Sequence, residues 1–347
     1  MAGRGADSGT DAEGARVGGG WGREIGGAEW GAWPAKGKIV LAERSGYDAR
    51  MKMSLKQRAL RALGHQYWLR GRDRVLRHFS DPDHHRSEPF EIDFFGLSYS
   101  GNLNNFIDWT VFYYGAYAVD ELHLLAALAD ALRAQGKPVN FYDVGANIGH
   151  HSLFMSSHAD RVFCFEPFSV VRQEMERKLN HAMVRNATVF PVALGNRNET
   201  GVFHPPTGAN QGTGTLGDLL PDNASAESIP VQVVRGDDFF TANRLPPISL
   251  LKIDVEGYEV NALEGFRETL WRDRPPILME IQRTNESGVD ADKSAVIRSL
   301  LYPDHLLFDV VGSRGRFTLK PFSMGDTEEA LVLPIELAGI IPGTACH

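Results

Sequence analysis

The feature of this sequence that most constrains its fold is a short apolar run that ends in an acid and is followed by a turn with two glycines. The run and turn cover residues 141–152, with the glycines at Gly145 and Gly149. A strand, a glycine turn and a helix start in this order let the backbone come close to a nucleotide-like ligand. The spacing is Gly-x-x-x-Gly, without the third glycine of the dinucleotide pattern, so it favours a ligand that has no pyrophosphate.

Strand and helix patterns alternate from residue 139 onward. Strands are expected at 139–144, 161–166, 188–194, 249–254, 276–281, 305–311 and 330–336, and helices after Gly149 and at 168–182, 258–271 and 292–302. This alternation predicts an α/β fold with a mostly parallel sheet and helices on both faces. Residues 195–236 are rich in Gly, Asn and Pro and interrupt the rhythm, so we interpret them as an insertion with a hairpin and a long loop.

The chain before this region has two sections. Residues 1–50 are rich in Gly and Ala and lack an apolar period, which predicts a disordered tail. The alternative is that the protein starts at Met51 or Met53. Residues 51–118 form an N-terminal extension or cap, and residues 119–347 form the main domain, which opens with a helix over 119–134.

The extension combines a basic segment with an aromatic one. Residues 54–79 show helical spacing and many cations, and Gly64 and Gly71 divide them into two short helices. This face either contacts an anionic surface or is simply solvated. The rings between Asp108 and Tyr117 suit core packing or a cap over a ligand pocket.

Composition excludes several classes of protein. The formal net charge of −8 argues against a specific nucleic-acid partner. Only Cys164 and Cys346 are present, so a disulfide scaffold is not expected. No apolar run approaches the ~18 residues of a membrane span, and the start does not resemble a signal peptide. A cytoplasmic location is the default expectation.

Glu166 is the first candidate ligand-binding side chain beyond the glycine turn. It ends the second expected strand, 21 positions after Gly145. An acid about 20 residues beyond the turn can accept hydrogen bonds from both ribose hydroxyls. The alternative is a surface carboxylate at a strand end.

Asp254 and Glu256 follow the fourth expected strand, at the sheet edge where ligands bind in open α/β folds. These carboxylates could bind an amine of a cofactor, accept a proton from a substrate hydroxyl, or bind a divalent metal ion. They could also cap the following helix. We assign no residue as a metal ligand on these patterns.

Four sequence blocks together resemble a known family. They are Asp143-Val144-Gly145-Ala146-Asn147-Ile148-Gly149, Phe165-Glu166-Pro167, Val192-Ala193-Leu194-Gly195 and Leu251-Lys252-Ile253-Asp254-Val255-Glu256-Gly257-Tyr258-Glu259. The sequence is similar to the FkbM-type S-adenosylmethionine-dependent methyltransferases over about residues 110–285. The stretch 112–117 also resembles the family's upstream segment, although Ala118 replaces an acid often found there.

This resemblance implies a class I methyltransferase (Rossmann-like) fold with a seven-stranded sheet whose last strand runs antiparallel. It implies that the cofactor is S-adenosylmethionine, with its methionine end held by Asp143, Gly145, Asn147 and Gly149, its ribose by Glu166, and its adenine beside Ala193 and the residues up to Asn196. It also implies O-methylation of a sugar, polysaccharide or secondary-metabolite hydroxyl. On position alone, Asp254 is our first candidate for proton acceptance, with Glu256 beside it. A catalytically silent cofactor-binding protein and a NAD-dependent oxidoreductase are the alternatives.

Overall fold

The structure is a computed structural model, and it describes residues 53–206, 214–216, 228–280, 296–313, 316–323 and 329–341. The disorder expected for residues 1–50 lies outside the described residues, as does most of the long loop expected within 195–236. No helix in the described part of the chain is long and apolar enough to cross a membrane.

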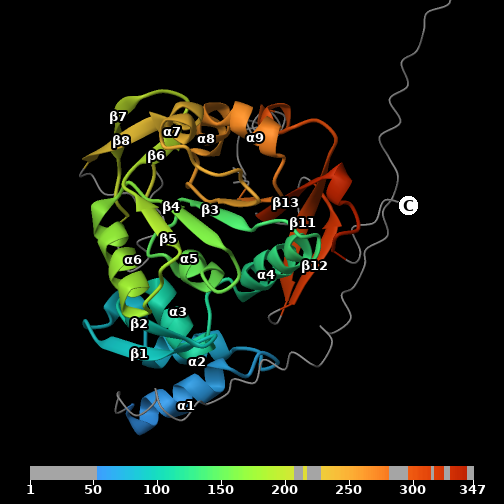
Figure 1. The fold of residues 1–347 in the computed structure, drawn as a ribbon. Coiled ribbons are helices and arrows are strands. Elements are labelled where there is room, and N and C mark those ends of the chain that lie inside the picture. Colours follow the sequence, from blue (N-terminus) through green and yellow to red (C-terminus); the bar gives the residue numbers. More distant parts are fainter. Residues whose placement is uncertain are drawn as a thin grey trace, which may run out of the picture.

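An eight-stranded sheet forms the centre of the molecule (Figure 1). Its order is β12 (Arg316–Pro321), β11 (His305–Ser313), β13 (Glu329–Pro334), β10 (Ile277–Glu280), β9 (Leu250–Ile253), β3 (Asn140–Val144), β4 (Arg161–Phe165) and β5 (Ala187–Phe190). The strands from β10 to β5 are parallel, and β13 runs antiparallel to β10. This order confirms the class I methyltransferase fold.

The expected seven strands are supplemented by an eighth, β12, which pairs only with β11 at the edge. Its inward side chains Phe317 and Leu319 are buried, and they alternate with exposed Arg316 and Lys320. Charged residues and a terminal proline are typical of an edge strand. The prediction of seven strands missed β12 because this alternating run is short.

Helices cover both faces of the sheet (Figure 1). One face carries α4 (Val119–Ala134), α5 (His150–Met155) and α6 (Ser169–His181); the other carries α7 (Gly236–Ala242), α8 (Glu259–Gly265) and α9 (Arg267–Asp273). Side chains of β3 alternate between the two cores: Phe141 joins the cluster with α4–α6, and Tyr142 and Val144 join the cluster with α7–α9. Burial on both faces explains why apolar side chains occur on both sides of this strand.

Two expected elements are divided in the structure. The third strand ends at Phe190, before Pro191, and β6 (Ala193–Gly195) instead joins a small sheet with β8 (Ile229–Arg235) and β7 (Glu199–Phe203). Proline has no N–H to extend the ladder of hydrogen bonds.

The single helix expected at 258–271 is divided into α8 and α9, with the break at Phe266. The carbonyl of Gly195 lies so close to Gly265 that a Cβ there would be 1.8 Å from it.

The N-terminal extension contains the two short basic helices that were expected, α1 (Leu55–Gly64) and α2 (Arg72–Phe79). Ser54 and Gln57 form a capping box that starts α1. A short turn, η1 (Pro82–His84), leads to the hairpin of β1 (Pro89–Phe94) and β2 (Leu97–Asn102), followed by α3 (Phe106–Tyr114). A final turn, η2 (Ile335–Leu337), follows β13.

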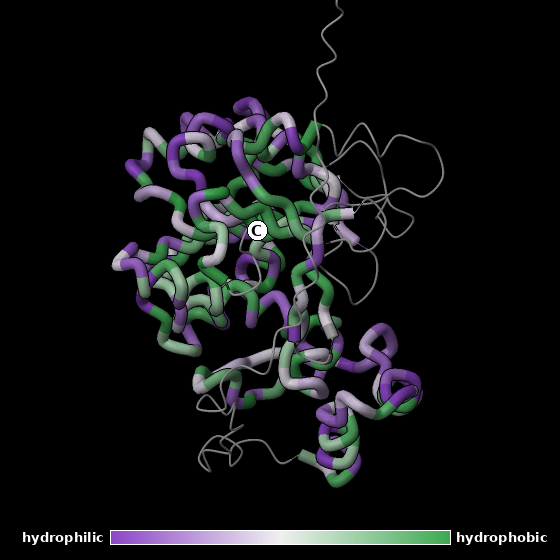
Figure 2. Tube along the Cα trace, turned by 90° about the vertical axis from the view of Figure 1, so that its right-hand side faces the viewer, coloured by the Kyte–Doolittle hydropathy of each residue, from purple (hydrophilic) through white to green (hydrophobic). Residues whose placement is uncertain are grey.

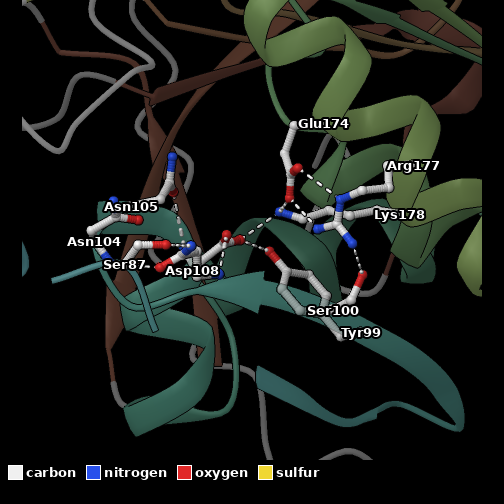
Figure 3. Close-up of polar contacts among 10 residues, drawn as sticks. Ser87, Tyr99, Ser100, Asn104, Asn105, Asp108, Glu174, Arg177 and Lys178 are labelled. Carbon is white, nitrogen blue, oxygen red and sulfur yellow. Dashed lines mark hydrogen bonds and ion pairs between the residues drawn. The ribbon is translucent and has the colours of Figure 1, made fainter. Parts of the chain in front are cut away.

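A buried ion pair joins this extension to the main domain (Figure 3). Nζ of Lys178 on α6 lies 2.6 Å from Oδ1 of Asp108 on α3, and both side chains are buried. The hydroxyl of Tyr99 donates to the same oxygen at 2.7 Å, and the N–H of Asn102 donates to Oδ2 at 2.8 Å. These hydrogen bonds offset the free-energy cost of removing the carboxylate from water. The ion pair therefore holds α3 and β2 against α6.

Candidate active site

The carboxyl ends of β3, β4 and β9 open into one pocket. It is lined by the turn after β3, by Glu166 and Pro167 after β4, and by Lys252 to Glu256 at the end of β9. Phe203 and Leu216 of the insertion and Tyr117 before α4 complete the wall. Three sequence blocks singled out for their chemistry therefore meet at the edge where ligands bind in such sheets.

Gly145 allows the turn after β3 to contact the backbone at the end of β9. It has a φ of 85°, and a Cβ at this position would lie 1.8 Å from the carbonyl oxygen of Asp254. The N–H groups of Gly145 and Ala146 both donate to the carbonyl of Phe165, at 3.0 and 3.1 Å. The turn is therefore held against β4 on one side and against the Asp254 backbone on the other.

Asn147 and Glu166 are in direct contact and both line the pocket. The backbone N–H of Asn147 donates to Oε2 of Glu166 at 2.9 Å, and that of Phe168 donates to Oε1 at 2.8 Å. Burial raises the pKa of Glu166 to about 7, although these two bonds oppose the shift. Asn147 adopts a φ of 51°, and its buried Oδ1 has no hydrogen-bond partner among the residues that the structure describes. Each Glu166 oxygen retains a free lone pair, and the Asn147 oxygen retains its full accepting capacity.

Asp143 and Gly149 support the pocket but do not line it. Oδ2 of buried Asp143 accepts a 2.5 Å hydrogen bond from Oγ of Ser152, which ties β3 to α5. Gly149 begins α5 with a φ of 78°, and a Cβ there would meet the side chain of Met175 at 2.5 Å. Both residues fix the course of the turn, and their direct contact with a cofactor stays a prediction.

A cluster of charges occupies the end of the pocket beside β9. Nζ of buried Lys252 lies 2.6 Å from Oδ2 of Asp254. Burial alone would lower the pKa of Lys252, but the carboxylates around it, Asp254 first, raise it well above its usual value. Burial likewise opposes ionisation of Asp254, yet the Lys252 ammonium lowers the pKa of Asp254 overall. The pair is therefore charged at neutral pH.

Glu280 joins Asp254 and Glu256, and sequence reasoning missed it. Carboxylate oxygens of the three residues lie within 4.8 Å of one another. Burial, followed by the charges of Asp254 and Glu256, raises the pKa of Glu280 to about 9, so it carries a proton at neutral pH and hydrogen-bonds to Asp254. Glu280 is the last residue of β10, next to β9, so its place at the same sheet edge was the available signal.

Two histidines at the start of α5 line the pocket, and burial keeps both neutral. Nε2 of His150 lies 2.9 Å from the carbonyl of Tyr117. Nε2 of His151 lies 3.2 Å from Oε2 of Glu121, in an alignment that does not form a hydrogen bond. Burial lowers the pKa of His151 to about 3 and raises that of Glu121 to about 7.

The other residues singled out in the sequence lie partly in the pocket wall and partly in the buried core. Ala193 and Leu194 line the pocket, as does Tyr258. Of the aromatic stretch, Trp109, Phe112 and Tyr113 on α3 are buried in the core, and Tyr117 lines the pocket. The stretch is therefore mainly core, with one contribution to the pocket wall.

Part of this chain is similar in sequence to two curated methyltransferases. Hexuronic acid methyltransferase AglP of Haloferax volcanii is 29% identical over 131 residues, which is 37% of this chain and 50% of that protein. The 2-O-methyltransferase NoeI of Sinorhizobium fredii is 29% identical over 147 residues, 38% of this chain and 59% of that protein. The chain thus spans about half the length of these curated relatives.

Among solved structures, the methyltransferase FkbM of Methylobacillus flagellatus matches at 18% identity with a TM-score of 0.35, covering 53% of this chain and 44% of that one. An S-adenosylmethionine-dependent methyltransferase of Agrobacterium tumefaciens matches at 10% identity with a TM-score of 0.41, covering 73% and 72%. The family model of the methyltransferase FkbM domain matches residues 143–308, from the end of β3 into β11. Residues 143–308 therefore match the methyltransferase FkbM domain, the family that the sequence blocks resemble.

Proposed function

We propose that this protein transfers a methyl group from S-adenosylmethionine to a hydroxyl oxygen of a sugar-containing acceptor. The observation that carries the proposal is the placement of Glu166 and Asn147 in one pocket with the close-packed turn at Gly145. A buried carboxylate with free lone pairs suits a pair of ribose hydroxyls, and the unpartnered Asn147 oxygen suits an ammonium or amide donor. The residues present therefore fit this cofactor.

Each wall of the pocket has a proposed role toward the cofactor. Glu166 accepts from the ribose hydroxyls, and Ala193 and Leu194 border the adenine. Gly145 and Asn147 face the methionine end, and Asp143 and Gly149 hold the turn in place from behind. When bound, S-adenosylmethionine supplies an activated methyl group on a sulfonium.

The chain's own contribution to the reaction is orientation of the acceptor and removal of its proton. Asp254 is ionised beside Lys252, so it can accept the proton that leaves the acceptor hydroxyl as the new oxygen–carbon bond forms. Glu256 lies next to it and adds negative charge at the same end. His151 and Tyr117 also line this pocket.

The acceptor class is proposed from the relatives. AglP is named for a hexuronic acid and NoeI for a 2-O position. We therefore propose a hydroxyl of a uronic acid or related sugar as the acceptor, free or within a glycan.

The proposal is tested by incubating the full chain with deuteromethyl-labelled S-adenosylmethionine and a panel of uronic acids, neutral hexoses and oligosaccharides. Mass spectrometry should find one labelled methyl group on a sugar oxygen, and Asp254→Asn should form this product more slowly, by about 100-fold or more. Cofactor binding without transfer to any acceptor would favour a silent binding protein. Binding of NAD in place of S-adenosylmethionine would favour an oxidoreductase.

A further inference from the structure

The two N-terminal helices expose apolar side chains to an unusual extent. Of the twelve large hydrophobic side chains that are exposed in the described part of the chain, five lie within residues 55–79. They are Leu55, Trp68, Leu69, Val75 and Phe79, of which Leu55 is 85% exposed and Trp68 66%. Single exposed apolar residues are ordinary, but a concentration of this kind marks an interaction surface.

The same helices carry concentrated positive charge in a chain whose net charge is −8. Residues 54–79 contain seven Lys and Arg residues against one acid, Asp73. The guanidinium groups of Arg61, Arg72 and Arg77 lie over aromatic rings of the extension.

Three further cations face outward. No hydrogen bond, ion pair or ring contact holds the guanidinium groups of Arg58, Arg70 and Arg74 in the described part of the chain, and all three residues are exposed. The packing of the extension does not account for them, so their charge is available to a partner.

The apolar residues and the free cations lie along one helical pair. Nζ of Lys56 donates to the carbonyl of Phe79 at 2.7 Å and lies 5.7 Å from the centre of its ring. The start of α1 therefore lies beside the end of α2, with the turn that carries Trp68 and Leu69 at the far end. Val75 and Phe79 share one side of α2, four residues apart. Figures 1 and 2 show the pair at the edge of the molecule, away from α7–α9, with hydrophobic and hydrophilic residues interspersed.

We propose that this outer face, formed by Leu55, Arg58, Trp68, Leu69, Arg70, Arg74, Val75 and Phe79, docks on the surface of an anionic lipid bilayer. Trp, Leu and Phe beside Arg are the combination that inserts at the boundary between head groups and acyl chains. The free cations complement anionic head groups. A nucleic acid or an acidic glycan would use the cations but would leave Leu55 and Phe79 exposed, so the bilayer accounts for more of the face.

The test is co-sedimentation of the full chain with vesicles of phosphatidylcholine alone and of phosphatidylcholine mixed with phosphatidylglycerol. The wild type should sediment with the mixed vesicles and remain in solution with phosphatidylcholine. The triple variant Arg58→Gln, Arg70→Gln, Arg74→Gln should bind about 100-fold more weakly, because each cation near an anionic surface contributes roughly a factor of five. The double variant Leu55→Ser, Trp68→Ser should also lose binding.

Matched controls separate this face from general charge and hydrophobicity. Arg185→Gln, Arg244→Gln, Arg316→Gln removes three exposed cations elsewhere, and Met183→Ser removes a side chain that is 68% exposed on the main domain. Both controls should bind like the wild type. Affinity for S-adenosylhomocysteine should be unchanged in every variant, so the result is independent of the proposed activity.

Three outcomes would overturn the proposal. The first is a wild type that stays in solution with anionic vesicles at low salt. The second is vesicle binding that the Leu55→Ser, Trp68→Ser variant retains in full, which would indicate adsorption by charge alone. The third is self-association that this variant abolishes in analytical ultracentrifugation while vesicles bind nothing, which would assign the face to a second copy of the chain.

Discussion

Nζ of Lys178 and Oδ1 of Asp108 lie 2.6 Å apart in the buried seam between the N-terminal extension and the main domain. Neither charge has access to water, and the hydroxyl of Tyr99 and the N–H of Asn102 complete the shell of the carboxylate (Figure 3). The extension is therefore joined to α6 by a group of polar contacts whose members depend on one another.

Lys178→Met should destabilise the protein strongly. It leaves the Asp108 carboxylate buried without its counter-ion, and losing one partner of such a pair costs about 3–5 kcal/mol. Urea unfolding measures the change. The control is Arg197→Met, because Arg197 pairs with Glu199 at the surface and is 70% exposed, and such pairs contribute about 0–1 kcal/mol. Equal stabilities for the two variants would contradict a structural role for the buried pair.

Gly145→Ala should abolish cofactor binding, because the added Cβ would meet the Asp254 carbonyl at 1.8 Å and push the turn away from β9. Gly136→Ala is the matched control. Gly136 has a similar positive φ of 73°, but a Cβ added there would meet no atom within 4 Å, so it shares the backbone strain without the clash. Calorimetric titration with S-adenosylhomocysteine should show binding for the control only, and binding to both would refute the close approach.

Asp254→Asn should reduce turnover by about 100-fold or more, the usual contribution of a general base. Affinity for S-adenosylhomocysteine should change little, because we assign cofactor binding to Glu166 and Asn147. The two measurements together distinguish loss of proton acceptance from collapse of the pocket. Full activity of the variant would remove Asp254 from the mechanism.

Because Glu280 is protonated in the folded protein, the free energy of unfolding should fall as the pH rises toward 9. Its pKa is about 9 in the folded protein and 4.5 when unperturbed, so the folded state keeps a proton that the unfolded state has lost throughout this window. Stability therefore falls with rising pH, by at most about 1.4 kcal/mol per pH unit for one proton.

Glu280→Gln should remove this loss. Burial raises the pKa of Glu166 and Glu121 only to about 7, so the interval from pH 7 to 9 isolates Glu280 among these acids. Melting temperatures at both pH values should fall further for the wild type than for the variant. Equal falls in melting temperature for the two proteins would show that Glu280 is ionised at neutral pH.

The sequence predicted the fold well where local signals and packing agree. The helix over 119–134 has the predicted bounds, because its apolar stripe, acidic start and terminal glycine coincide. Gly64 and Gly71 likewise divide the basic segment into α1 and α2 as expected. The family blocks predicted the mostly parallel sheet and its antiparallel strand, and three of the four blocks end strands β3, β4 and β9 at the same edge.

Long-range contacts explain the errors. The break at Phe266 follows Gly265, which lies against the Gly195 carbonyl, a contact distant in sequence. The Asp143 side chain accepts a hydrogen bond from Ser152 of α5, a partner that the motif does not indicate. Glu280 reaches the site only because β10 lies beside β9, and its raised pKa depends on burial that the sequence does not contain.

The most direct test of cofactor identity and of its ribose partner is a calorimetric titration of the wild type and of Glu166→Gln with S-adenosylhomocysteine and with NAD. We expect the wild type to bind S-adenosylhomocysteine and not NAD. Glu166→Gln should bind S-adenosylhomocysteine about 10-fold or more weakly, because one side-chain oxygen is replaced by an NH2 group that faces a backbone donor and cannot accept. Equal affinity of both proteins for S-adenosylhomocysteine, or binding of NAD alone, would contradict the proposed cofactor site.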